Sequence, residues 1–120
     1  MKFVPKEPLP SMAAVELSTS HITRSDNDVL TEMATGDDPF ALDYYPDLLL
    51  RRPLEYLEGF ILVVPTRSSV PHWPAAQRRL RKHFSAAFVK LLGILRQRKI
   101  RLLVLDRDAP EVGWLPKFEW

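Results

Sequence analysis

The chain of 120 residues is long enough for one domain with a real core, since 46% of its residues are hydrophobic and 10% are aromatic. It contains no cysteine, which excludes disulfides, thiolate metal ligands and a cysteine nucleophile within the chain. The net charge of +2 conceals a polarised chain: residues 59–105 carry 10 Lys or Arg and no acid, whereas residues 1–58 carry 11 acids and 5 bases. This polarity points to a charged macromolecular partner more than to any particular chemistry.

The N-terminal residues give the expected domain organisation. Residues 1–12 contain three prolines and little periodicity, so they predict an extended arm that precedes a single domain over residues 13–120. The start lacks the apolar run of a signal peptide, and the longest strongly apolar run is far shorter than the ~20 residues that cross a bilayer. We therefore expect a cytoplasmic protein with no membrane segment.

The first half of the domain predicts a strand followed by a helix. Residues 14–19 have the pattern of a short strand. Thr23 is the expected N-cap of the next helix, because Asp26 follows three residues later and complements its first turn, and Gly36 is its expected end. Residues 37–58 are interrupted by prolines and do not indicate a single structure.

Two strands are expected in the second half. Residues 60–64 are all apolar, which predicts a strand placed centrally in a sheet and buried on both faces. Residues 102–105 predict a second buried strand. The alternating aromatic and aliphatic residues of 113–120 indicate an ordered end of the chain.

Two helices are expected between these strands. Pro74 suits the first turn of a helix that runs to about Lys82, and Ser85 is the expected N-cap of a second helix over residues 86–97. The buried stripe of this second helix consists of Phe88, Leu91, Leu92 and Leu95. The order of elements predicts an α+β domain with about three helices packed on a three- to four-stranded sheet.

Two blocks near the ends of the domain share their order and spacing with a known family. The first spans residues 17–23 and continues to Asp26 and Asn27, and the second includes residues 84–89, 103–108 and 115–120. They resemble a family of small proteins of unknown function that are carried on bacterial plasmids, integrative elements and prophages. The resemblance implies a mobile-element setting and supplies no catalytic residue. The family-like residues are His21, Thr23, Asp26, Asn27, Asp106, Asp108 and Trp120.

A metal-dependent hydrolase is the enzymatic alternative. Asp106 and Asp108 follow a predicted strand, and with His21, Asp26 or Asn27 close by they could hold Mg²⁺. The structural interpretation is simpler, because Asp-Arg-Asp before Ala-Pro suits a turn, Asp26 suits a helix start and His21 suits a hydrogen-bonded loop residue. We therefore expect no catalytic residue, no metal and no cofactor.

Basic residues form the main candidate for a binding surface. Across residues 74–101 the predicted patch consists of Arg78, Arg79, Arg81, Lys82, Lys90, Arg96, Arg98 and Lys99, with Arg101 continuing it. Such a patch suits phosphates, and Trp73 beside it could stack on a base. Alternatively the basic residues are solvated helix faces, partly neutralised by Asp37, Asp38, Asp43 and Asp47.

A protein interface is the other binding hypothesis. Aromatic residues often anchor such interfaces, and the candidates here are Tyr44, Tyr45, Trp73 and Trp114. We expect a non-catalytic protein that binds a host macromolecule, first of all a protein or protein complex, and thereby inhibits a bacterial defence system. A nucleic-acid accessory protein is the alternative. A dipolar surface also favours self-association as a homodimer.

Overall fold

The structure, a computed structural model, describes residues 11–35, 44–45 and 50–120, of which residues 44–45 and 50–51 are described by their backbone alone. The predicted arm therefore lies almost wholly outside the described residues, as does the predicted helix end at Gly36. Within the described ranges, no helix combines the length and the hydropathy needed to cross a bilayer.

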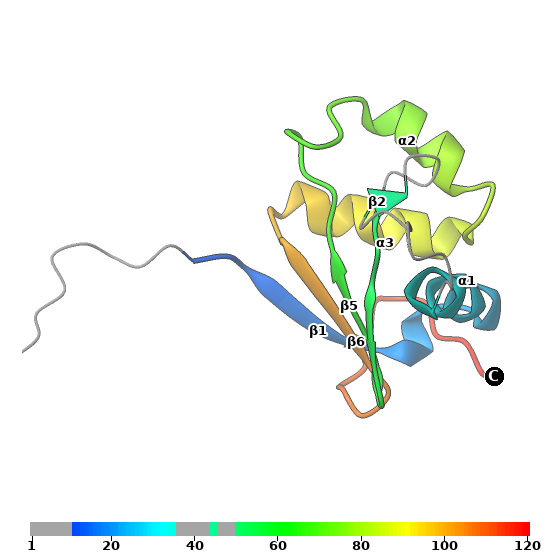
Figure 1. Ribbon diagram of the computed structural model, residues 1–120. Helices are drawn as coiled ribbons and strands as arrows, with labels where there is room; N and C mark the ends of the chain where they lie inside the picture. The colour runs from blue at the N-terminus through cyan, green and yellow to red at the C-terminus, as the bar shows by residue number, and fades with distance from the viewer. Residues whose placement is uncertain (1–10, 36–43, 46–49) are drawn as a thin grey trace, which may run out of the picture.

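A mixed sheet forms the centre of the molecule (Figure 1). Its four strands stand in the order β1 (Ala14–Ser18), β6 (Leu102–Asp106), β5 (Gly59–Val63) and β4 (Leu54–Tyr56). β1 runs parallel to β6, whereas β5 is antiparallel to both of its neighbours. Residues 37–58, for which the sequence indicated no single structure, include a separate antiparallel pair of strands, β2 (Tyr44–Tyr45) and β3 (Leu50–Arg51).

In the described part of the chain, three α-helices accompany the sheet: α1 (Arg24–Thr35), α2 (Trp73–Leu80) and α3 (Ala86–Gln97). A short 3₁₀ helix, η1 (Thr19–His21), joins β1 to α1. The prediction for α3 is confirmed at both ends, and the Ser85 hydroxyl accepts a hydrogen bond from the Phe88 amide at 3.2 Å. α2 ends two residues earlier than expected, because the chain turns after Leu80. The predicted α+β class is confirmed.

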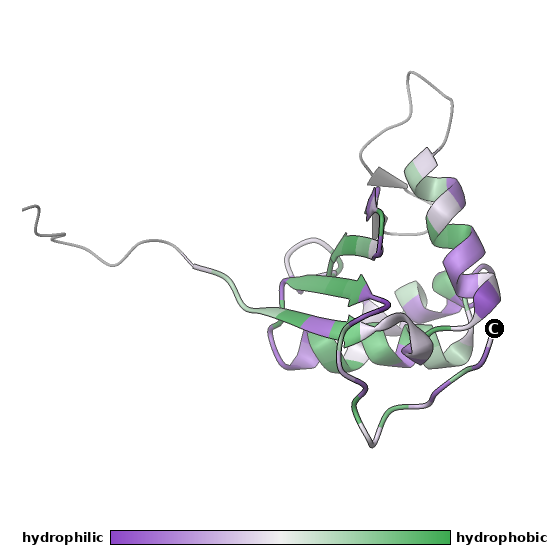
Figure 2. Ribbon diagram, turned by 90° about the horizontal axis from the view of Figure 1, so that it is seen from below, coloured by the Kyte–Doolittle hydropathy of each residue, from purple (hydrophilic) through white to green (hydrophobic). Residues whose placement is uncertain are grey.

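The sheet packs its helices against one face. Phe60 and Leu62 of β5 are buried in the core, together with Leu103 and Leu105 of β6, whereas the alternate residues of both strands are only half-buried. The expectation that residues 60–64 are buried on both faces is therefore wrong, although the central position of β5 is right. A continuous apolar run suggested two covered faces, but here apolar residues also occupy the half-exposed face, as the largely green strands of Figure 2 show.

Candidate functional site

Asp26 links the starts of two helices. Its side chain is fully buried, and its Oδ2 accepts from the Thr23 amide (3.0 Å) while the Thr23 hydroxyl accepts from the Asp26 amide (3.1 Å). This reciprocal pair confirms Thr23 as the N-cap of α1. The same carboxyl group also accepts from the Ser85 amide (2.7 Å) and the Ser85 hydroxyl (2.6 Å), so it fixes the start of α1 against the start of α3.

His21 joins the C-terminal segment to η1. The ring is 2% exposed, with Nε2 2.8 Å from the Val112 amide and Nδ1 2.8 Å from the Pro116 carbonyl oxygen. An amide can only donate, so Nε2 is the acceptor and Nδ1 carries the hydrogen that it donates to Pro116. The hydrogen-bonded interpretation of His21 is thus confirmed.

Two further hydrogen bonds hold the last residues. The Phe118 amide donates to the Ser20 carbonyl (2.7 Å), and the indole of Trp120 donates to the Ile22 carbonyl (3.0 Å). Figure 1 shows this red segment running back beside the base of α1. The predicted ordered end is confirmed, although Trp120 remains 52% exposed and so does not complete the core.

Asp106 closes the turn after β6. Its Oδ2 accepts from the Tyr56 hydroxyl (2.8 Å) and its Oδ1 accepts from the Asp108 amide (2.8 Å). The turn interpretation of the Asp-Arg-Asp sequence is therefore confirmed. Partial burial, followed by the hydrogen bond to Asp106 and the nearby carboxylates, raises the pKa of Tyr56 to about 12.

The residues of the hydrolase hypothesis are divided among these contacts. Asp26 and His21 each serve a different structural junction, and Asp106 serves the turn. Across the described ranges, no group of three or more His, Asp or Glu side chains is placed to hold a metal ion. The hydrolase hypothesis gains no support from this geometry and stays a prediction.

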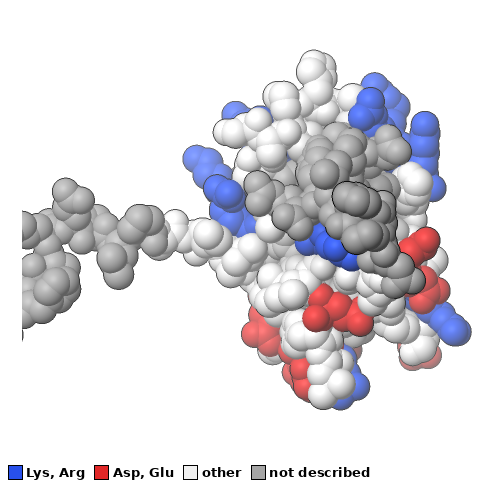
Figure 3. Space-filling view, in the orientation of Figure 1, with Lys and Arg blue, Asp and Glu red and all other residues white. Residues whose placement is uncertain are grey.

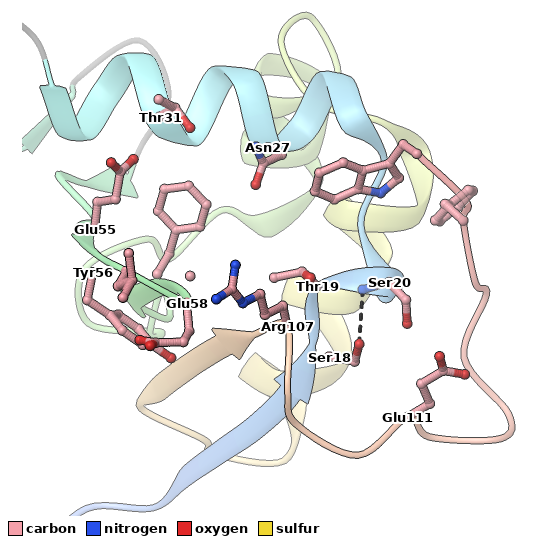
Figure 4. Close-up of a pocket in the computed structure, with 15 residues that line it drawn as sticks. Ser18, Thr19, Ser20, Asn27, Thr31, Glu55, Tyr56, Glu58, Arg107 and Glu111 are labelled. Carbon is pink, nitrogen blue, oxygen red and sulfur yellow. Dashed lines mark hydrogen bonds between the residues drawn. The ribbon is translucent and has the colours of Figure 1, made fainter.

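A pocket of about 520 Å³ lies between α1, the β4–β5 turn and the C-terminal segment. Figure 4 shows Asn27 and Thr31 of α1 facing it from one side and the guanidinium of Arg107 reaching into its middle. Its lining also includes the aromatic side chains of Phe60, Phe118 and Trp120 and three glutamates. This mixture of one cation and three acids favours no single class of ligand.

A larger cavity, of about 960 Å³, is the basic cleft, which lies between the loop after β5 and one side of α3. Among the described residues, its lining contains five cations and no acid; the cations are Arg67, Lys90, Arg96, Lys99 and Arg101. Four of these five belong to the basic residues singled out from the sequence, namely Lys90, Arg96, Lys99 and Arg101. Arg67 was missed, although it lies in the same acid-free stretch, because a loop residue carries no periodicity that would align it with a helix.

Trp73 lies inside the basic cleft but is held by the fold. Its indole packs so closely on α3 that a Cβ at Gly93 would lie 3.1 Å from the indole nitrogen. The Arg96 guanidinium stands 5.3 Å from the ring centroid and donates to the Val70 carbonyl (3.0 Å). Trp73 therefore docks α2 onto α3, and the structure does not present it as an open platform for a base.

The remaining residues of the predicted patch lie outside this cleft. The Arg98 guanidinium stands over the ring of Trp114, 5.2 Å from its centroid. A residue of the predicted basic patch is thus next to one of the predicted interface aromatics. Trp114 is 59% exposed. The other four are exposed around the end of α2 and do not line the cleft: Arg78, Arg79, Arg81 and Lys82.

The charges segregate in space as they do in sequence. Figure 3 shows most Lys and Arg in the upper half, around α2 and α3, and the Asp and Glu in the lower half. Between described residues, the one ion pair joins Lys117 to Glu111 at 3.4 Å, so the basic cleft is not neutralised by a described acid. The side chains of Tyr44 and Tyr45, and the four aspartates expected to neutralise the patch, lie outside the described residues.

Comparison with known proteins identifies the family but no function. Neither the curated proteins nor the solved structures gave a match. A family model described as the C-terminal domain of a family of unknown function, DUF5983, matches residues 14–120, which include every described helix and strand. The chain therefore belongs to the DUF5983 family through this C-terminal domain.

Proposed function

We propose that this protein is a non-catalytic binding protein that takes nucleic acid into its basic cleft. The observation that carries the proposal is a concave surface of about 960 Å³ whose described lining holds five cations and no acid. Long cationic side chains around a groove suit a chain of phosphates, which they neutralise with release of counterions. The cleft supports the nucleic-acid alternative, with Arg67 and basic residues of 90–101 in place of those of α2.

The distribution of apolar side chains favours nucleic acid over an acidic protein at this cleft. Protein interfaces usually rest on buried apolar or aromatic anchors within a charged rim. Among the residues whose side chains are described, the large hydrophobic ones that are exposed lie outside the cleft: Met12, Leu54, Leu57, Trp114 and Trp120. Trp73, the aromatic residue of the cleft, is already packed on α3, so we expect contacts to phosphates rather than to base edges, and little sequence preference.

The setting that the family resemblance implies is a mobile element in a bacterial host. A small nucleic-acid-binding accessory protein would act there on the element's own DNA or RNA or on that of the host. Inhibition of a host defence system stays a prediction from this setting, and it requires a protein partner.

The test is the affinity of the purified protein for a fluorescent 20-nucleotide single-stranded DNA, measured by anisotropy over a series of NaCl concentrations. Two double variants, R67E/R101E in the cleft and R78E/R79E on α2, change the net charge equally, and all four side chains are exposed. We expect the cleft variant to bind about tenfold more weakly and to reduce the log–log salt slope by about 1.4. The α2 variant should keep most of the affinity.

Two results would contradict this proposal. One is the absence of binding by the wild type at 50 mM salt, and the other is an equal loss in both double variants. A pull-down from the bacterial host, with and without nuclease, separates the two classes of partner. Recovered nucleic acid that disappears with nuclease supports the cleft, whereas a protein that survives nuclease supports the host-protein hypothesis.

A further inference from the structure

Lys99 occupies a backbone conformation that lysine rarely adopts. Its φ of 59° is positive, and among the described residues it is the one non-glycine residue with a positive φ. The Ile100 amide donates to the Leu95 carbonyl (2.9 Å) and the Lys99 amide donates to the Arg96 carbonyl (3.1 Å). These two hydrogen bonds form a Schellman motif, in which the position of Lys99 is usually glycine. A side chain there costs folding free energy.

The surrounding chain explains why the turn is kept at this place. α3 ends at Gln97 and β6 begins at Leu102, so four residues reverse the chain direction. Ile100 packs against the core, and the Arg101 amide donates to the Ala13 carbonyl (2.8 Å) beside β1. The backbone of the turn is therefore required by its neighbours, but none of these contacts needs a lysine side chain.

The Lys99 side chain serves no described contact of its own. It is exposed, makes no hydrogen bond or ion pair with a described residue, and lines the basic cleft beside Arg96 and Arg101. Strained residues that the fold does not need often mark functional positions, because selection retains them against a loss of stability.

We infer that Lys99 is a phosphate-contacting residue of the basic cleft, kept at this turn at the expense of stability. The inference rests on the proposed function. Lysine acts as a compact point charge that binds a phosphate without needing the planar geometry of an arginine fork. The tight turn directs this charge from the end of α3 toward the same cavity as the loop residue Arg67.

The test compares K99G with K99R and with K82A, which removes an equal charge from an exposed lysine outside the cleft. The probe is the same 20-nucleotide DNA, and thermal unfolding is measured alongside. We expect K99G to bind about five times more weakly with a salt slope lower by about 0.7, and to melt within about 2 °C of the wild type or above it. K99R should bind within about twofold of the wild type, since it keeps the charge.

Each outcome bears on one of the two proposals. Wild-type binding that K99G weakens no more than K82A does would overturn the role of Lys99 and leave the cleft intact. A K99G variant that melts more than about 4 °C lower would show that the lysine serves the fold, which also overturns the inference. Absence of binding by the wild type would overturn the proposed function and this inference with it.

Discussion

The two halves of this molecule use their polar side chains in opposite ways. Around η1 and the start of α1, Asp26 and His21 have their hydrogen-bonding atoms matched within the chain, and they join segments that are far apart in sequence. In the basic cleft, the side chains of four of the five basic residues make no hydrogen bond or ion pair with described residues. Asp26 and His21, which the hydrolase hypothesis used as metal ligands, therefore hold the fold together. The basic residues, which could be read as an ordinary solvated helix face, are the ones left to bind a partner.

Replacing Asp26 by asparagine should have the largest effect. The Asp26 carboxylate accepts hydrogen bonds from three donors, namely the amides of Thr23 and Ser85 and the Ser85 hydroxyl. D26N replaces one carboxylate oxygen by an NH₂ group, which cannot accept, so at least one of these donors loses its acceptor. We expect the free energy of unfolding to fall by about 3 kcal/mol, as for other buried groups left unsatisfied. Urea denaturation followed by circular dichroism measures this loss.

Asp28 provides the matched control for that variant. It lies two residues further along the same helix and is exposed. D28N should therefore change stability by less than about 0.5 kcal/mol. If both variants lost the same stability, the carboxyl group of Asp26 would not be the link between α1 and α3.

A smaller loss is expected when His21 is replaced by alanine. H21A removes the acceptor of the Val112 amide and the donor to the Pro116 carbonyl, and it leaves a cavity in a buried site. We expect a loss of about 2 kcal/mol, together with faster hydrogen exchange at the amides of Val112 and Phe118. The exposed residue His83 is the control, because H83A should leave this exchange unchanged. Unaltered exchange in H21A would mean that the C-terminal segment is held without the imidazole.

The sequence was sufficient wherever a local pattern decides the structure. α3 was predicted to the residue because Ser85 offers a cap and an apolar stripe repeats with helical spacing. Thr23 and Asp26, which are only three residues apart, likewise predicted the start of α1. The second partner of Asp26 could not be predicted, because Ser85 lies 59 residues away and only the packing of the two helices brings it close.

The same limit applies to the binding surface. Lys90, Arg96, Lys99 and Arg101 were predicted as basic positions, but the cleft also needs Arg67 from the loop after β5. One-sided burial of β5 was also beyond the sequence, since a fully apolar run is compatible with one or two covered faces. Both features depend on tertiary placement, which no local periodicity encodes.

The smallest effect concerns Tyr56, whose side chain is also hydrogen-bonded within the chain but is only partly buried. Its phenol donates to Asp106 and its pKa is raised to about 12 from the ordinary value of 10.0. Because the folded protein keeps this proton at a pH where the unfolded chain has lost it, the stabilisation from Tyr56 is complete below pH 10 and is lost as the pH rises toward 12.

Y56F should cost about 1 kcal/mol at neutral pH, and this difference from the wild type should shrink above pH 10. Absorbance of tyrosinate during an alkaline titration gives an independent measurement, in which Y56F should lack the highest-pH step of the wild type. A Tyr56 that ionises near pH 10 would show that its hydrogen bond to Asp106 contributes little to stability. The stabilising role of internally hydrogen-bonded side chains would then be limited to His21 and Asp26.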